Sequence, residues 1–148
     1  MSSISEYLSE EHRHCDDLFV EAENAVSQSR WNDAEKLFYG FRFSTELHFN
    51  REELVLFPAF EQATTPSGGP TEVMRSEHRQ IRSILQRLEE ALKKRDTDQF
   101  LGEAETLLPL IQQHNLKEES MLYRMASQVL ANQADTLIGR MQALDITT

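Results

Sequence analysis

The sequence predicts an all-α protein, an up-down-up-down four-helix bundle with a short C-terminal helix, and three observations support this fold class. Apolar residues recur at spacings of three and four along most of the chain, which is the pattern of amphipathic helices. The 148 residues include only five glycines and four prolines, which favours long helices over many short strands. One strong loop signal, at residues 64–70, divides the chain into two halves. We therefore expect residues 1–148 to form a single domain, with the bundle at about 4–130 and a C-terminal segment at 131–148.

Each predicted long helix carries one stripe of mainly apolar residues, and the stripes place these helices near residues 4–28, 33–63, 71–94 and 98–130. In chain order, the stripes consist of Leu8, Cys15, Leu18, Phe19, Ala22, Ala25 and Val26; of Leu37, Phe38, Phe41, Thr45, His48, Glu52 and Val55; of Met74, His78, Ile81, Leu85, Leu88 and Leu92; and of Leu107, Leu110, Ile111, His114, Glu118, Met121, Leu122 and Met125. A shorter amphipathic segment near 134–145 carries Leu137, Ile138, Met141 and Leu144.

The helix boundaries carry local signals of their own. Three segments resemble capping boxes, in which two side chains satisfy free backbone donors of the first turn: Ser3-x-x-Glu6, Asn32-x-x-Glu35 and Asp96-x-x-Gln99. Pro58 and Pro109 fall inside the second and fourth helices. Each proline removes a backbone donor, so we expect a kink or an interruption at both positions.

The charge balance limits the classes of partner. Lys and Arg number 15 against 25 Asp and Glu, and the resulting net charge of −10 argues against nucleic acid or an anionic membrane as the main partner. No stretch approaches the roughly 18 apolar residues of a membrane span, and the N-terminus lacks the pattern of a secretory signal. The one cysteine, Cys15, cannot form an intrachain disulfide. We therefore expect a cytoplasmic protein.

The two halves of the chain repeat with an offset of 66 residues. Glu11-His12-Arg13 recurs as Glu77-His78-Arg79, and His48-x-x-x-Glu52-Glu53-x-x-Leu56-Phe57 recurs as His114-x-x-x-Glu118-Glu119-x-x-Leu122-Tyr123. The chain has only five histidines, so their return at matching positions together with a Glu-Glu pair is unlike a coincidence of composition.

The repeated residues predict a metal site. Residues at i and i+4 share a helix face, so His48 points the same way as Glu52, and His114 the same way as Glu118. An unpaired carboxylate in a bundle core is costly, and a bound cation compensates for it. A single histidine on an apolar face is more often a hydrogen-bonded core residue, but six repeated residues favour metal binding. The predicted ligands are His12, His48, Glu52, His78, His114 and Glu118.

Other polar residues near this set receive different interpretations. His14 lies two positions from the first predicted ligand and is expected on the surface. Glu53 and Glu119 are one step off the ligand face, so we interpret them as flanking groups rather than bridges. Cys15 is expected to be a small core residue rather than a reactive thiol.

At these residues the chain resembles the hemerythrin-like family of His-His-Glu cation-binding domains. The pattern is His, His-x-x-x-Glu, His, His-x-x-x-Glu, the segment Glu52 to Pro58 is also similar, and the resemblance covers about residues 4–130. This family is a four-helix bundle that holds two non-haem irons. We therefore expect two iron ions in this chain, with zinc or manganese as possible substitutes. The resemblance implies two bridging carboxylates and an oxo or hydroxo bridge. It assigns His12 and His48 to one iron, His78 and His114 to the other, and Glu52 and Glu118 to the bridges.

One feature departs from the oxygen-carrying hemerythrins, which have His-x-x-x-His on the third helix and an aspartate as the last ligand. Here Arg82 stands four residues after His78, and the last carboxylate is Glu118. The ligand set looks more like that of the repair-of-iron-centres proteins, which handle nitric oxide and damaged iron clusters, although we do not expect their short cysteine-bearing N-terminal domain. Such a set would leave one coordination position open on each iron, which favours reactivity over reversible oxygen carriage. Arg82 is expected either to reach the rim of the site and bond to Glu118 or a bound anion, or to cover the edge of the core as a solvated side chain.

Three classes of function fit this pattern. The first is a di-iron protein that binds or reacts with a small diatomic ligand (nitric oxide or oxygen) or peroxide, in oxidative or nitrosative stress defence or iron-centre repair. The second is an oxygen- or iron-sensing or storage module without turnover. The third, a structural bundle or one holding zinc or manganese, is disfavoured because a structural core does not need six inward polar ligands. A sensor usually carries an output domain, which we do not expect within 148 residues, so the first class is favoured. The sequence leaves the oligomeric state open.

Overall fold

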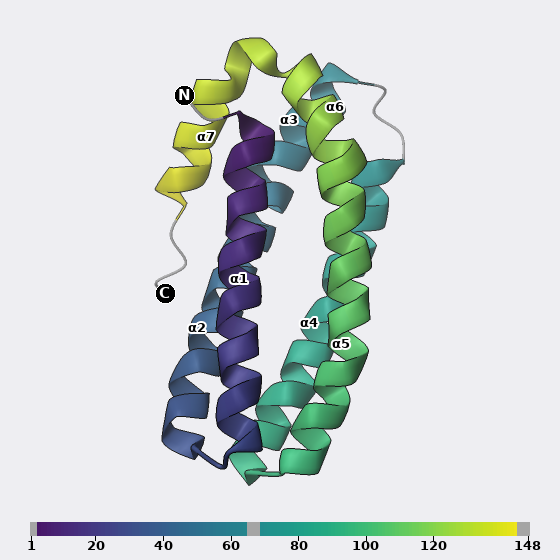
Figure 1. Ribbon diagram of the computed structural model, residues 1–148. Coiled ribbons are helices and arrows are strands. Elements are labelled where there is room, and N and C mark those ends of the chain that lie inside the picture. Colours follow the sequence, from purple (N-terminus) through teal and green to yellow (C-terminus); the bar gives the residue numbers. More distant parts are fainter. Residues whose placement is uncertain (1–2, 65–68, 145–148) are drawn as a thin grey trace.

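A computed structural model describes residues 3–64 and 69–144, and within these ranges the chain contains helices and no strands (Figure 1). In chain order the elements are α1 (Ile4–Ser27), α2 (Trp31–Arg51), the π-helical turn η1 (Glu52–Leu56), α3 (Phe57–Ala63), α4 (Pro70–Lys94), α5 (Thr97–Lys117), the π-helical turn η2 (Glu118–Leu122), α6 (Tyr123–Val129), the short 3₁₀ helix η3 (Ala131–Gln133) and α7 (Ala134–Ala143). The predicted all-α class is confirmed. The predicted loop falls mostly on residues 65–68, which lie outside the described residues, as do residues 145–148 of the predicted C-terminal segment.

Four antiparallel columns form the bundle, because α2 continues through η1 into α3 and α5 continues through η2 into α6. α1 packs against α2 and α4 against α5, while contacts of α2 with α4 and of α1 with α5 complete the ring. α7 turns back along the outside of the bundle and contacts α1 and η1 (Figure 1). Among the described residues, none of the helices combines the length and apolar character needed to cross a bilayer.

The two hairpin turns, α1–α2 and α4–α5, share one backbone geometry. Ser29 and Arg95 both have positive φ angles, 57° and 53°, in the left-handed region that residues other than glycine seldom adopt. In each turn the next backbone N–H donates to the carbonyl five residues earlier, from Arg30 to Ala25 at 2.8 Å and from Asp96 to Ala91 at 2.9 Å. This is the Schellman closure of a helix C-terminus, and it occurs in both halves of the repeat.

Two of the three predicted capping interactions are present. Ser3 Oγ accepts from the backbone N–H of Glu6, and Asp96 Oδ1 accepts from that of Gln99, both at 3.0 Å. The predicted box at Asn32 is wrong, because α2 already begins at Trp31 and its N-cap, Arg30, makes no side-chain capping bond. The Schellman turn ends at residue 30, so the next helix starts there without room for a later cap.

The two prolines that were predicted to kink or interrupt a helix lie in different local settings. Pro109 does not interrupt α5, which runs from Thr97 to Lys117. Pro58 occupies the first turn of α3, where its missing N–H costs little. The π-helical turn before it does not require a proline, because η2 has the same form and is followed by Arg124 at the equivalent position.

The π-helical turns also shift the register of the residues that follow them. Met121 and Met125, which the 3.6-residue period placed in the core, are 48% and 37% exposed, so that prediction is wrong. Leu122, which belongs to the same predicted stripe, is buried, whereas Tyr123 and Ala126 are buried in place of the two methionines. A π-helical turn accommodates one more residue than an α-helical turn, and the inward face therefore moves by one position.

Two hydrophobic clusters fill the bundle and leave a polar layer between them. The hairpin-end core lies toward the two hairpin turns and includes Phe19, Phe38, Leu88 and Phe100. The terminal core lies at the other end and includes Ile4, Leu8, Leu56, Phe57, Tyr123, Leu137 and Met141. Because α7 supplies apolar residues to the terminal core, the C-terminal segment covers this end of its own bundle.

Candidate metal centre

The polar layer brings all six predicted ligand residues together in the interior. His12 comes from α1, His48 from α2, His78 from α4 and His114 from α5, while Glu52 and Glu118 are the first residues of η1 and η2. None of the six exposes more than 5% of its surface. Their ligand atoms form two groups, in each of which the atoms lie within 4.8 Å of one another: Glu52, His78, His114 and Glu118 in one, and His12, His48 and Glu118 in the other. We call these six residues the ligand cluster.

Every histidine of the ligand cluster donates its Nδ1 proton to a carboxylate outside the cluster. The four bonds are His12 to Glu119 at 2.6 Å, His48 to Glu11 at 2.8 Å, His78 to Glu53 at 2.6 Å and His114 to Glu77 at 2.7 Å. A histidine that donates from Nδ1 keeps the lone pair of Nε2 free for a metal and has a fixed ring orientation. The flanking residues Glu53 and Glu119 therefore orient histidines by accepting from Nδ1, the ring nitrogen on the side away from the cluster. Glu11 and Glu77, to which sequence analysis assigned no role, do the same.

Arginine or lysine side chains in turn bind three of these four outer carboxylates. Arg82 donates to Glu53 at 2.9 Å and to Glu46 at 3.1 Å. Arg51 pairs with Glu11 and Lys117 with Glu77. Through its bonds with His78 and Arg82, and despite burial, the pKa of Glu53 falls to about 2, so this carboxylate stays ionised.

The observed place of Arg82 corrects both interpretations drawn from the sequence. Its guanidinium bonds to Glu53 and Glu46 instead of Glu118, and the side chain is half-buried instead of solvated. The Arg82 Cζ atom lies 5.1 Å from the centre of the Phe49 ring, which stacks on His78 at a centroid distance of 3.8 Å. Arg82 therefore acts on the site through His78 and its neighbours. His14 is exposed as predicted, and Cys15 is half-buried against the hairpin-end core.

Several polar atoms at the centre of the cluster have no hydrogen-bond partner. These atoms are Glu52 Oε1, Glu118 Oε2, His78 Nε2 and His114 Nε2. His78 Nε2 lies 3.0 Å from Glu52 Oε1 without the alignment of a hydrogen bond. Orphaned polar atoms in a bundle core are costly, whereas nitrogen and carboxylate oxygen atoms that converge in this way are the donor set of a transition-metal ion. The residues present therefore fit a metal.

The electrostatics of the cluster favour a bound cation. Burial and the neighbouring Glu118 raise the pKa of the Glu52 carboxyl, whereas His114 and nearby hydrogen bonds hold the pKa of Glu118 well below its usual value despite burial. Against the effect of burial, the charge of Glu118 raises the pKa of His114 to about 9, and Glu52 raises the pKa of His48 well above its usual value. Without a metal the cluster thus holds extra protons, and metal binding would release them.

Sequence analysis gave no role to Tyr123, the first residue of α6, although its hydroxyl contacts residues of the ligand cluster. Its hydroxyl is 2.6 Å from Glu52 Oε2 and 2.8 Å from Glu118 Oε1. Burial and these two carboxylates raise the pKa of the phenol well above its usual value. The 66-residue repeat contains the signal that could have identified this residue, because Tyr123 stands where the first half has Phe57.

A four-helix bundle whose interior histidines and glutamates converge from all four columns defines a metal-binding helical protein. The family model described as "Hemerythrin HHE cation binding domain" matches residues 3–126, and the chain belongs to this family. The same comparisons gave no match among curated proteins and none among solved structures.

Proposed function

We propose that the ligand cluster holds two iron ions and that the protein binds or reacts with a small diatomic ligand, nitric oxide or oxygen, or with peroxide. In this proposal His12 and His48 bind one ion, His78 and His114 bind the other, and Glu52 and Glu118 bridge the pair. The observation that carries it is the division of the ligand atoms into two groups that share Glu118. Iron would supply redox chemistry and open coordination positions, while the protein supplies orientation and excludes water.

A small cavity beside the ligand cluster supports a small ligand. Its volume is about 30 Å³, and His12, His48 and His114 line it together with Thr45, Phe49 and Ile111. A cavity needs roughly 10–15 Å³ to hold one water molecule, so this one suits a molecule of two or three atoms. Larger organic substrates would not fit. This size favours nitric oxide, oxygen or peroxide as the reacting species.

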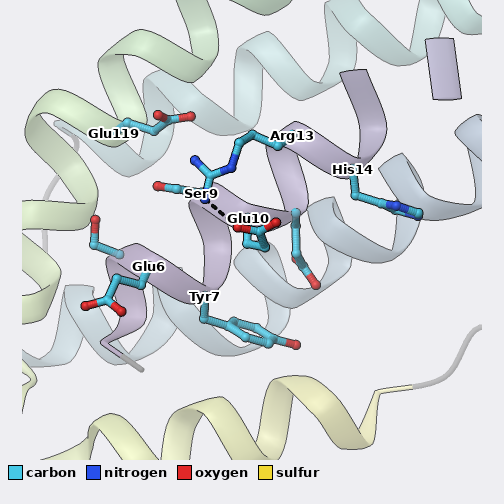
Figure 2. Close-up of a pocket in the computed structure, with 9 residues that line it drawn as sticks. Glu6, Tyr7, Ser9, Glu10, Arg13, His14 and Glu119 are labelled. Carbon is cyan, nitrogen blue, oxygen red and sulfur yellow. Dashed lines mark hydrogen bonds and ion pairs between the residues drawn. The ribbon is translucent and has the colours of Figure 1, made fainter. Parts of the chain in front are cut away.

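A larger hollow of about 700 Å³ lies on the surface along α1, but none of the six ligand residues lines it (Figure 2). Glu11 and Glu119, which hold His48 and His12 from behind, lie on its wall. The hollow therefore brings solvent to these two outer carboxylates, Glu11 and Glu119. In the proposed function it is the route by which protons released from the cluster reach water.

Metal analysis combined with optical spectroscopy tests the proposal. Protein supplemented with ferrous iron and purified without chelators should hold two irons per chain, and its spectrum should change on addition of oxygen or nitric oxide. His12→Ala should lower the iron content, whereas His14→Ala, which alters an exposed histidine two residues away, should leave it unchanged. A well-folded preparation with at most one tightly bound metal would contradict the dinuclear site.

A further inference from the structure

The hydroxyl of Tyr123 lies among four of the atoms assigned to one metal. Its distances are 2.6 Å to Glu52 Oε2, 2.8 Å to Glu118 Oε1, 3.1 Å to His12 Nε2 and 3.3 Å to His48 Nε2. A phenol donates one hydrogen bond and accepts at most two, so it cannot satisfy four neighbours by hydrogen bonding. Hydrogen bonding alone therefore does not account for this position.

Octahedral coordination does account for it. With metal–ligand bonds of about 2.1 Å, neighbouring ligand atoms lie about 3.0 Å apart and opposite ones about 4.2 Å apart. Each corner of an octahedron has four neighbouring corners, and the Tyr123 oxygen has four neighbours at this spacing. The distance of 4.0 Å between His48 Nε2 and Glu118 Oε1 matches two opposite corners, and that of 3.0 Å between His12 Nε2 and Glu118 Oε1 matches two adjacent ones.

The repeat provides an internal comparison for this position. Phe57 comes directly after η1, as Tyr123 comes directly after η2. In each case the backbone N–H donates to the carbonyl of the glutamate five residues earlier, Glu52 or Glu118. The Tyr123 ring stacks on His12 at 5.6 Å and 26°, and the Phe57 ring stacks on His78 at 5.9 Å and 21°. The two positions thus differ mainly by one hydroxyl group, which only the His12 side of the cluster has.

We propose that Tyr123 is a ligand of the metal held by His12 and His48, bound through its phenolate oxygen. This assignment rests on the proposed function and specifies the chemistry of its site. When Tyr123 binds the metal, its phenolic O–H bond breaks and an oxygen–metal bond replaces it. The proton passes to the buffer, and the oxidation state of the metal does not change. Two histidines, two glutamates, Tyr123 and a bridging oxygen then complete six-fold coordination at this metal. The metal held by His78 and His114 keeps the one open position, so small ligands bind there.

The test uses the two positions as a matched pair. Wild type, Tyr123→Phe, Phe57→Tyr and the control Tyr39→Phe, which alters a surface tyrosine, are loaded with ferrous iron and oxidised in air. A phenolate bound to ferric iron produces a visible charge-transfer band and tyrosinate modes in the resonance Raman spectrum. We expect both signals in wild type and Tyr39→Phe, their loss in Tyr123→Phe with two irons retained, and an additional contribution in Phe57→Tyr. Circular dichroism verifies that each variant is folded.

Azide titration gives a second measurement on the same preparations. Wild type should take up one azide per iron pair, Tyr123→Phe should take up two, and Phe57→Tyr should take up none. Two bound irons whose spectrum lacks phenolate signals, or keeps them in Tyr123→Phe, would overturn the assignment and leave the proposed function standing. A folded wild-type chain that binds no iron would overturn both.

Discussion

Glu53 accepts the Nδ1 proton of His78 at 2.6 Å, while the residue before it, Glu52, points its carboxylate at the centre of the ligand cluster. Two adjacent glutamates thus serve the same site from opposite sides of one imidazole. Successive residues of a helix point about 100° apart, so one can face the centre while the next reaches the back of a histidine on the neighbouring column. Glu119 and Glu118 stand in the same relation to His12.

The first prediction concerns this outer carboxylate. Glu53→Gln keeps the shape of the side chain but removes the negative charge that makes the His78 Nε2 atom a stronger metal ligand. Loss of such a partner typically lowers metal affinity about 10- to 100-fold. Competition with a chelator of known affinity measures the effect, and Glu105→Gln, at an exposed position on α5, is the control. Equal affinities in the two variants would show that Glu53 does not support the ligand.

The second prediction concerns Arg82, which binds Glu53 and Glu46. Arg82→Ala should weaken metal binding less than Glu53→Gln does, because Arg82 does not contact a ligand itself and reaches His78 only through Glu53 and the Phe49 ring. The two changes together should cost less than the sum of their separate effects, since they interrupt one chain of contacts. The exposed Arg79→Ala is the control. Additive effects in this double-mutant cycle would show that Arg82 and Glu53 influence metal binding independently.

Arg82→His should not supply a fifth histidine ligand, contrary to what the sequence spacing suggests. The Phe49 ring stacks against His78 and lies beside the guanidinium, so an imidazole at position 82 is directed toward Glu53 and Glu46. We expect unchanged spectra for the iron-loaded variant and the same number of azide-binding positions as wild type. An additional histidine ligand in its spectra would contradict this placement.

The third prediction concerns removal of the metal. The unfolded chain cannot assemble the ligand cluster, so metal binding stabilises the fold by mass action, by about 2.7 kcal/mol at a free metal concentration 100 times the dissociation constant. The melting temperature of chelated protein should therefore rise when ferrous iron is added. In His114→Ala, which removes a donor from one of the two groups, the rise should be smaller. A melting temperature that stays unchanged at saturating metal would argue against a metal in the core.

The fourth prediction concerns the small cavity. Ile111→Phe should fill the space beside His48 and His114, so nitric oxide should bind more slowly while the iron content stays the same. Stopped-flow absorbance measures the rate, and Leu108→Phe, which alters an exposed residue of the same helix, is the control. Unaltered binding in Ile111→Phe at full iron content would mean that ligands reach the cluster by another path.

The fold class and the inward position of the six predicted ligand residues could be predicted from local periodicity and the repeat. His48 with Glu52 and His114 with Glu118 share a helix face over four residues, and the 66-residue repeat identifies His12 and His78 as their partners. The cap at Asp96 could also be predicted, since it depends on only three following residues. The predicted box at Asn32 was wrong because the Schellman turn before it sets where α2 begins.

By itself, the sequence determined that four amphipathic helices would form and that four histidines and two glutamates would lie on their inner faces, because these properties depend on residues three or four positions apart. Only the tertiary structure decided the place of Tyr123, the exposure of Met121 and Met125, and the contact of Arg82 with Glu53. In a regular α-helix Tyr123 would point about 140° away from Glu118, five residues earlier. The π-helical turn η2 removes most of that rotation and directs both side chains to one centre. Such a turn loses regular helical hydrogen bonds, and packing in the assembled bundle stabilises it. For this reason, the periodicity of the sequence does not predict it.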